Sequence, residues 1–196
     1  MPRSPEANEQ VRQATKEKIL IAAKNVFFAK GFHSASIDDV AKAALISKGL
    51  LYNYFKGKED LLAALVDVRI DELMVVMNEA KAKQNPLEQL RHIIVGALED
   101  VQKRPEAFRF YQNLFTQPKK DEIIAKQSAR LNQEYEKQFK VQTEIFRKLG
   151  VPDPVQRSLY FSSAIQGVML LFSTYPEFYP LEKVKEQLIT EFCRKN

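Results

Sequence analysis

The sequence predicts an all-α protein of about nine helices, with a small three-helix N-terminal head on a larger helical body. Three observations support this fold class. Apolar residues recur at helical spacing through most of the 196 residues. Asn-Gly and Asp-Gly hairpin turns are absent, and alternating β-branched runs are few. The six glycines and nine prolines fall mainly between the helical stretches, where they begin or end helices.

The head is expected to contain one long and two short helices. The first spans 15–30, with an apolar stripe, and ends at Gly31. Ser36 is the expected N-cap of a second helix reaching Ala44, with Asp39 completing a variant capping box. Ser47 similarly caps a third helix over 48–54. The stripe consists of Ile19, Ala22, Ala23, Val26 and Phe27, and the second helix packs through Ile37, Val40, Ala41 and Ala44.

Six further helices are expected in the body, separated by prolines and by Gly150. Their ranges are 59–83, 86–104, a short helix from 105 that ends before Pro118, 121–149, 155–175, and a last helix from Pro180 to about 194. We expect three regions: a flexible arm over 1–14, the head over 15–58, and the body over 59–196. The long helix from residue 59 is expected to join head and body rigidly.

The net charge of +5 lies entirely in the first 58 residues. That stretch holds ten Lys and Arg against five Asp and Glu, whereas the remaining 138 residues hold twenty of each. A basic head on a neutral body is typical of proteins that bind a polyanion. Taken alone, the same charge also fits an ordinary solvated surface.

Composition excludes several classes of protein. Cys193 is the single cysteine, so we expect no intrachain disulfide and no structural zinc site. Because the start of the chain is polar, we expect no signal peptide, and no run of about 18 apolar residues predicts a membrane span. We therefore expect a cytoplasmic protein that needs no metal or other cofactor and makes no membrane contact.

The long, short, short arrangement of the three head helices is that of a helix-turn-helix. Its sequence is Ser-Ile-Asp-Asp-Val-Ala-Lys over 36–42, then Ile-Ser-Lys-Gly-Leu-Leu-Tyr-Asn-Tyr-Phe-Lys-Gly-Lys-Glu-Asp-Leu-Leu over 46–62. Together with Phe-Phe-Ala-Lys-Gly-Phe over 27–32, these runs resemble the head of TetR-type (tetracycline-repressor-like) transcriptional regulators. The resemblance covers residues 15–62. Beyond that range it extends only to the number and order of helices.

The resemblance implies that the head binds double-stranded DNA. Serine caps would place helix N-termini near phosphates, and tyrosine and lysine side chains would contact the backbone. Asn53 would pair with an adenine edge, and Gly49 would allow close approach to the DNA. The residues expected at the DNA are Ser36, Ser47, Lys48, Gly49, Leu50, Tyr52, Asn53, Tyr54, Lys56 and Lys58. Structural alternatives remain for the aromatic residues, which fit an apolar core, and for the lysines, which fit a solvated surface.

Two residues depart from the family pattern. Leu45 stands where the turn usually carries glycine. Either the turn keeps a positive φ there, at a cost of about 1–2 kcal/mol, or it is rearranged and Leu45 packs inward. Leu50 replaces a small hydroxyl residue and would exchange a hydrogen bond for apolar contact, such as with a thymine methyl group. We expect both changes to affect the operator sequence more than DNA binding itself.

The middle helices of the body are expected to enclose a small, largely apolar effector molecule. Taken singly, each candidate residue fits an ordinary apolar core better than a ligand contact. They are His92, Phe108, Tyr111, Phe115, Phe139, Gln142, Phe146 and Gln166, with Gly167 nearby. His33 is expected at the surface or near a phosphate.

The last two helices are expected to form a homodimer, because their apolar residues cover more than one face. Two heads would then reach half-sites about 34–36 Å apart on a palindromic operator. The alternative is a central core helix within a monomer. The expected interface residues are Phe161, Ile165, Val168, Met169, Phe172, Leu188 and Phe192.

Two other classes of function compete with a DNA-binding repressor released by its effector. An enzyme is disfavoured because the sequence offers no nucleophile–base pair, metal-ligand cluster or glycine-rich phosphate loop. The second alternative is a helical interaction protein with a degenerate head, for which Leu45 and Leu50 are the evidence.

Overall fold

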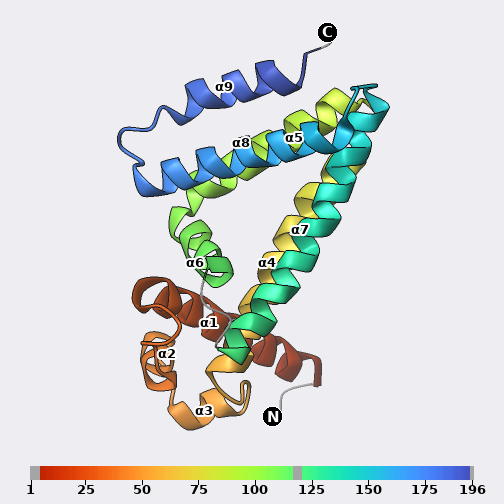
Figure 1. Ribbon diagram of the computed structural model, residues 1–196. Coiled ribbons are helices and arrows are strands. Elements are labelled where there is room, and N and C mark those ends of the chain that lie inside the picture. The colour runs from red at the N-terminus through yellow and green to blue at the C-terminus, as the bar shows by residue number, and fades with distance from the viewer. Residues whose placement is uncertain (1–4, 117–120, 195–196) are drawn as a thin grey trace. The chain divides into compact units, whose positions relative to one another are not determined.

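The computed structural model of the protein describes residues 5–116 and 121–194, and within these ranges all regular elements are α-helices (Figure 1). This confirms the predicted all-α class. None of the described helices has the length and apolarity needed to cross a membrane. The helices are α1 (Pro5–Lys30), α2 (Ile37–Ala43), α3 (Lys48–Tyr52), α4 (Lys58–Lys81), α5 (Pro86–Lys103), α6 (Pro105–Thr116), α7 (Glu122–Lys148), α8 (Pro154–Thr174) and α9 (Leu181–Phe192).

The chain divides into two compact units after residue 68, rather than at the expected position 58. The helix α4 continues through this division. The division falls later because the first turns of α4 bury apolar side chains together with the head. These residues are Leu61, Leu62, Leu65 and Val66.

The first helix begins ten residues earlier than expected. Residues 5–14, predicted as part of a flexible arm, form the first turns of α1, and residues 1–4 lie outside the described ranges. Proline suits the first position of a helix, and the Glu, Ala, Gln and Arg residues that follow are good helix formers. Apolar periodicity missed these turns because they are exposed and carry no apolar stripe.

Reciprocal side-chain capping defines the start of α2, as predicted. Ser36 Oγ accepts a hydrogen bond from Asp39 N at 3.1 Å, and Asp39 Oδ2 accepts one from Ser36 N at 3.0 Å. Lys30 Nζ donates to the same carboxylate at 2.7 Å, which ties the end of α1 to α2. Ser47 caps α3 by accepting from Leu50 N at 3.1 Å. These caps satisfy backbone N–H groups that the helices leave unpaired.

The turn between α2 and α3 has the hydrogen bonds of a Schellman motif. Ile46 N donates to Ala41 O at 3.0 Å, and Leu45 N donates to Lys42 O at 3.0 Å. The residue at the centre of this motif must have a positive φ, which favours glycine. Leu45 has φ 53° and its side chain is 82% exposed. The first alternative is therefore confirmed: the turn has a positive φ at Leu45, and the leucine does not pack inward.

Replacing Leu45 with glycine should stabilise the head by about 1 kcal/mol, because it relieves the left-handed strain of a residue with a Cβ atom. Native-state hydrogen exchange at the α2 and α3 amides of the full chain measures this free energy of opening. Leu45→Ala is the matched control, since it removes the exposed side chain but keeps the strain. Equal opening free energies for the two variants would contradict this account of the turn.

The charged contacts of the capping box predict an acid-sensitive head. The hydrogen bond from Lys30, followed by those from Ser36, lowers the pKa of Asp39 well below its usual range. A depressed pKa stabilises the fold above the unfolded value of about 3.9, and this contribution is lost as the pH falls through the folded pKa. Opening of α2, measured by hydrogen exchange, should therefore become easier below about pH 4. Asp39→Asn should open more readily at neutral pH, and its difference from the native chain should shrink in acid; a constant difference would refute the assignment.

The second unit is built around α8, which packs against α5, α6, α7 and α9 (Figure 1). Phe146, Phe161 and Phe192 meet edge-to-face at the centre of this core, with ring centroids 5.0–6.3 Å apart. Edge-to-face contacts are a favourable arrangement of aromatic rings. This core fixes the inner face of α8 and leaves the opposite face of the helix exposed.

Candidate DNA-binding surface and ligand cavity

The third helix of the head is anchored by one side chain. Leu51 is fully buried, and Phe55, just beyond the helix, is also buried. The helix ends at Tyr52 rather than at Tyr54 as expected, and Asn53 is its C-cap. A helix of five residues with one buried position leaves the rest of its surface available to a partner.

Most residues expected at the DNA lie on this exposed surface. Gly49 has no atom within 4 Å of the position that a Cβ would occupy, so the fold of the head does not require glycine there. Glycine destabilises a helix relative to alanine, and its presence fits close approach of a partner at this position. Tyr54 is half-buried. The exposed residues are Ser36, Ser47, Lys48, Gly49, Leu50, Tyr52, Asn53 and Lys56.

Lys58 has a structural role that the sequence did not reveal. Its ammonium group donates to the backbone carbonyls of Phe32 at 2.9 Å and His33 at 3.1 Å. It also lies 4.8 Å from the centre of the Phe32 ring, a cation–π contact. These contacts hold the loop after α1 against the start of α4, and they direct Lys58 inward rather than toward a phosphate. The exposed His33 is part of this loop.

Ion pairs within the head reduce the number of cations available to DNA. Lys30 pairs with Asp39, and Lys42 pairs with Asp38 at 2.6 Å. Lys48 lies close enough to Asp38 to contribute to the lowered pKa of that carboxyl group, after the larger effects of Lys42. The basic character of the interface therefore rests on fewer side chains than the ten Lys and Arg of the N-terminal stretch.

Lys56 and Lys58 provide a matched pair that tests this division of roles. Lys56→Ala should weaken binding to all DNA sequences and reduce the slope of log K against log[salt] by about 0.9, the value for one phosphate contact. Lys58→Met should mainly ease local opening of the head, measured by hydrogen exchange, and leave the slope unchanged. Fluorescence anisotropy with mixed-sequence DNA from about 50 to 200 mM salt measures the slopes. Native binding independent of salt would instead support the interaction-protein alternative.

The second unit contains a cavity of about 310 Å³ bounded by α4, α5, α7 and α8. This volume is near the lower limit of ligand pockets, which span roughly 300–1,000 Å³. Apolar side chains from all four helices form much of the wall. They are Leu73, Val76, Met77, Ile93, Ala97, Phe139, Ile165 and Met169.

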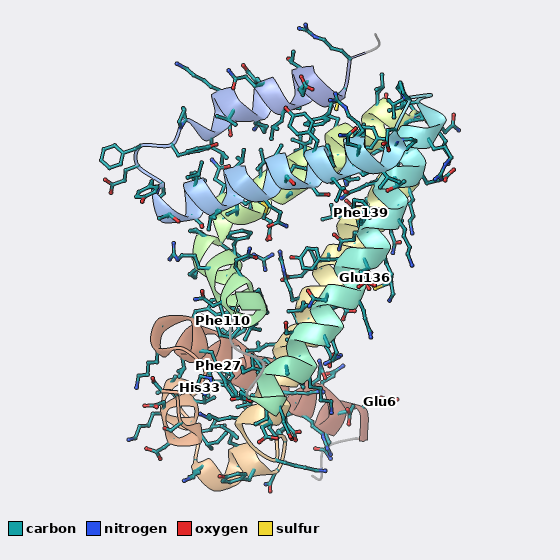
Figure 2. All side chains as sticks on the ribbon, viewed as in Figure 1. Glu6, Phe27, His33, Phe110, Glu136 and Phe139 are labelled. Atoms are coloured by element: carbon teal, nitrogen blue, oxygen red, sulfur yellow. The ribbon has the colours of Figure 1, made fainter. Side chains whose placement is uncertain are left out.

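Three of the residues expected at an effector line this cavity: Phe139, which Figure 2 labels on α7, Gln142 and Gln166. Gln142 Oε1 accepts a hydrogen bond from Ser162 Oγ at 2.7 Å, which fixes one polar point on the wall between α7 and α8. Gly167 is not part of the lining.

The other expected effector residues are placed differently. Phe108 and Phe146 belong to the apolar core, because they lie on the inward faces of α6 and α7. Tyr111 is buried with the guanidinium of Arg69 at 5.6 Å from its ring centre, and it lies outside the cavity lining. His92 pairs with Glu79 at 3.1 Å, away from the cavity. The Phe115 side chain lies outside the described residues.

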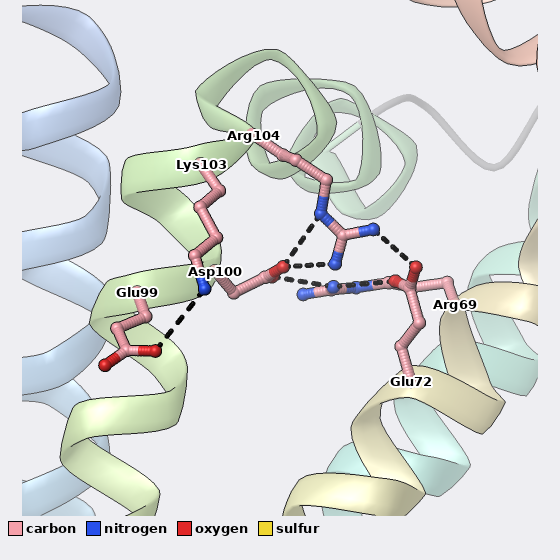
Figure 3. Close-up of polar contacts among 6 residues, drawn as sticks. All are labelled: Arg69, Glu72, Glu99, Asp100, Lys103 and Arg104. Atoms are coloured by element: carbon pink, nitrogen blue, oxygen red, sulfur yellow. Dashed lines mark hydrogen bonds and ion pairs between the residues drawn. The ribbon is translucent and has the colours of Figure 1, made fainter.

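Four charged residues form an ion-pair network on the cavity wall (Figure 3). Arg69, only 5% exposed, donates to Asp100 at 2.7 Å and to Glu72 at 3.2 Å. Arg104 pairs with the same two carboxylates. The network therefore links α4 to the end of α5 through two bridging arginines. We call these four residues the charged quartet.

The quartet favours the charged forms of Arg69 and Asp100. Burial alone would lower the pKa of Arg69, but Asp100, Tyr135 and Glu72 outweigh burial and raise it. Burial would likewise raise the pKa of Asp100, and the two arginines reverse that effect and lower it. Breaking such a buried pair by removing one partner is strongly destabilising, because a charge is left uncompensated.

The quartet was not predicted from the sequence, although the sequence contains one signal of it. Arg69 lies four residues after Leu65 and four before Leu73, so it interrupts the apolar stripe of a long helix. A charged residue at a stripe position is expected to be buried with a partner. Its partner on α5, Asp100, lies 31 residues away in the sequence. Helical periodicity relates positions within one helix, so it cannot identify a partner on another helix.

The residues expected at a dimer interface are buried within a single chain, which corrects that assignment. Phe161, Ile165, Val168, Met169, Phe172, Leu188 and Phe192 are all at most 9% exposed and belong to the core of the second unit. The helix α8 does have apolar residues on a second face, but they are not the residues that we expected at the interface. The exposed ones are Val155, Leu159, Leu170 and Leu171, with Tyr175 and Phe178 following the helix.

The described residues thus combine a helix-turn-helix head, whose third helix is mostly exposed, with a helical unit that holds a cavity. Residues 19–65 match the model of the family described as bacterial regulatory proteins, tetR family. The head of the chain is therefore similar to the TetR family of bacterial regulatory proteins over these residues.

Comparisons with individual proteins agree with this family. The HTH-type transcriptional activator FasR of Mycolicibacterium smegmatis is 27% identical over 114 residues, covering 57% of this chain and 52% of FasR. A TetR-like regulator from Rhodococcus sp. RHA1 has a similar fold, with TM-score 0.76 and 21% identity over 97% of this chain and 94% of that one. FadR from Bacillus subtilis, solved in complex with stearoyl-CoA, has TM-score 0.72 and 19% identity over 92% of this chain and 98% of that one. The chain spans about half the length of the curated relatives it matches.

Proposed function

We propose that the protein is a transcriptional repressor that binds a palindromic operator as a homodimer and is released when a small, largely apolar molecule occupies its cavity. The observation that carries this proposal is the exposed surface of α3 in a head similar to the TetR family. The residues that contact DNA are then those exposed around α3, with Tyr54 at the margin. The protein acts in the cytoplasm, where DNA and small metabolites are both accessible.

A small-molecule effector is supported by the cavity and by the quartet on its wall. The relative FadR was solved with a bound ligand, stearoyl-CoA. Because α4 contributes Arg69 and Glu72 to the wall and Leu61 and Leu62 to the buried part of the head, one helix belongs to both units. Ligand contacts that alter the quartet would shift α4, with a coupling of about 1–3 kcal/mol.

A dimer is supported by the outer face of α8. Leu159 and Leu170 are 54% and 47% exposed, and Ser163 and Gly167 lie between them along the helix. Small residues between larger apolar ones allow two helices to approach closely, and a cluster of exposed apolar residues on one face indicates a contact surface. A two-fold axis near this face would duplicate the head for two half-sites.

Charges placed on this face should separate the dimer and abolish tight operator binding. We expect the double variant Leu159→Glu, Leu170→Glu to sediment as a monomer and to bind an operator selected from random DNA at least 100-fold more weakly than the native chain. Binding to a single half-site should change little, since each head still makes its own contacts. Val75→Glu is the control, because Val75 is 55% exposed on α4. A double variant that remains dimeric, or keeps native operator affinity, would disprove the assigned interface.

A further inference from the structure

The cavity wall contains buried polar atoms that the protein leaves unpaired. Four buried side-chain atoms have no hydrogen-bond partner among the described residues, and three of them belong to residues of this cavity. They are Arg69 Nε on α4, Gln138 Nε2 on α7 and Gln166 Oε1 on α8. Buried polar groups in folded proteins are nearly always hydrogen-bonded, so each such atom requires an explanation. Their convergence from three helices on one cavity indicates the polar end of a ligand.

Helix geometry explains why the two glutamines do not satisfy each other. Gln142 and Ser162 are bonded where α7 and α8 approach. Gln138 lies four residues before Gln142 on α7, and Gln166 lies four residues after Ser162 on α8, so both are farther from the α7–α8 connection. The two helices lean apart in that direction (Figure 1), and both amides line the cavity without a bond between them. A ligand atom between them would complete the row of polar contacts that the Gln142–Ser162 pair begins.

The charge of the wall selects against an anionic ligand. The quartet holds two guanidinium groups and two carboxylates, so its formal charge is zero. A ligand carboxylate or phosphate near Arg69 would also lie near Asp100 and Glu72, and their repulsion would offset the attraction. An uncharged hydrogen-bond acceptor on the ligand could accept from Arg69 Nε without this repulsion.

The chemistry of the unpaired atoms narrows the ligand further. The Arg69 Nε–H group can only donate, so it requires an acceptor on the ligand. The glutamine amides present either an oxygen or an NH₂ group after a half-turn of the amide, so they can match a carbonyl or an N–H. The apolar remainder of the wall suits a hydrocarbon body.

We propose that the cavity binds an uncharged carbonyl compound with an apolar tail, whose carbonyl oxygen accepts from Arg69 Nε and whose polar end lies between Gln138 and Gln166. This inference rests on the proposed effector function and specifies the chemical class of the effector. Gln138 and Gln166 are then the residues that distinguish a polar end group from a plain hydrocarbon end.

Calorimetric titration of the full-length protein without DNA tests this proposal with ligands of equal chain length. At pH 8, n-decanamide should bind at least tenfold more tightly than decanoate, which is ionised, and more tightly than decanoyl-CoA. Tighter binding of decanoate or decanoyl-CoA would overturn the proposal, as would a failure of all three probes to bind.

Two substitutions locate the binding site. Gln138→Leu removes an unpaired amide and should preserve folding, while it weakens n-decanamide binding about tenfold. Gln133→Leu, at an exposed position of the same helix, should leave binding unchanged. Ala97→Phe should fill the cavity and abolish binding, with native helix content in its circular dichroism spectrum. Unchanged n-decanamide binding by Gln138→Leu or by Ala97→Phe would overturn the proposal.

DNA binding measured on the same preparations separates this inference from the proposed function. Salt-dependent DNA binding together with preference for decanoate refutes only the carbonyl-ligand inference. Preference for n-decanamide without any DNA binding refutes the regulator function and leaves the cavity assignment supported.

Discussion

The burial of Leu51 is the contact on which the proposed reading surface depends. It is the only buried residue of α3, and it packs this helix, which contacts α2, into the head while the remaining positions stay exposed. The caps at Ser36 and Ser47 and the strained turn at Leu45 serve the same end, because they fix where each short helix begins. Isolated helices of this length are unstable in water. The surface of α3 therefore exists only because the surrounding head supports it.

The body poses a different physical problem, which is to keep an apolar cavity open beside buried charge. The quartet solves part of it by pairing every charge with an opposite one, so Arg69 can be buried without carrying an uncompensated charge. One donor of this wall, Arg69 Nε, has no hydrogen-bond partner among the described residues. The helix α4 carries Arg69 and also contributes Leu61 and Leu62 to the buried part of the head.

Local signals in the sequence predicted the head well. The Ser36 and Asp39 capping box follows from spacing over four residues. For Leu45 the sequence left two alternatives open, and the hydrogen bonds of the turn decide for the positive φ. The inward direction of Lys58 was not predictable, because its partners are carbonyls of a loop 25 and 26 residues earlier. The early start of α1 was missed for another reason, since exposed helical turns leave no apolar pattern.

The body was harder to predict because apolar periodicity does not say which neighbour a helix face meets. Phe161 and Leu159 both stand on α8, yet one is fully buried in its own chain and the other is half exposed. Phe108 and Phe139 are equally aromatic, but only Phe139 lines the cavity. Whether a residue is buried, exposed or lines the cavity depends on how helices distant in the sequence pack together. The contacts of the quartet, which join α4 to the end of α5, depend on the same packing.

Hydroxyl-radical footprinting can show whether two copies of α3 contact one DNA duplex. On an operator selected from random DNA, we expect two protected patches on one face of the duplex, with centres about 10 base pairs apart or a multiple of that distance. One continuous patch without two-fold symmetry, or no protection at concentrations where the protein is dimeric, would contradict this expectation.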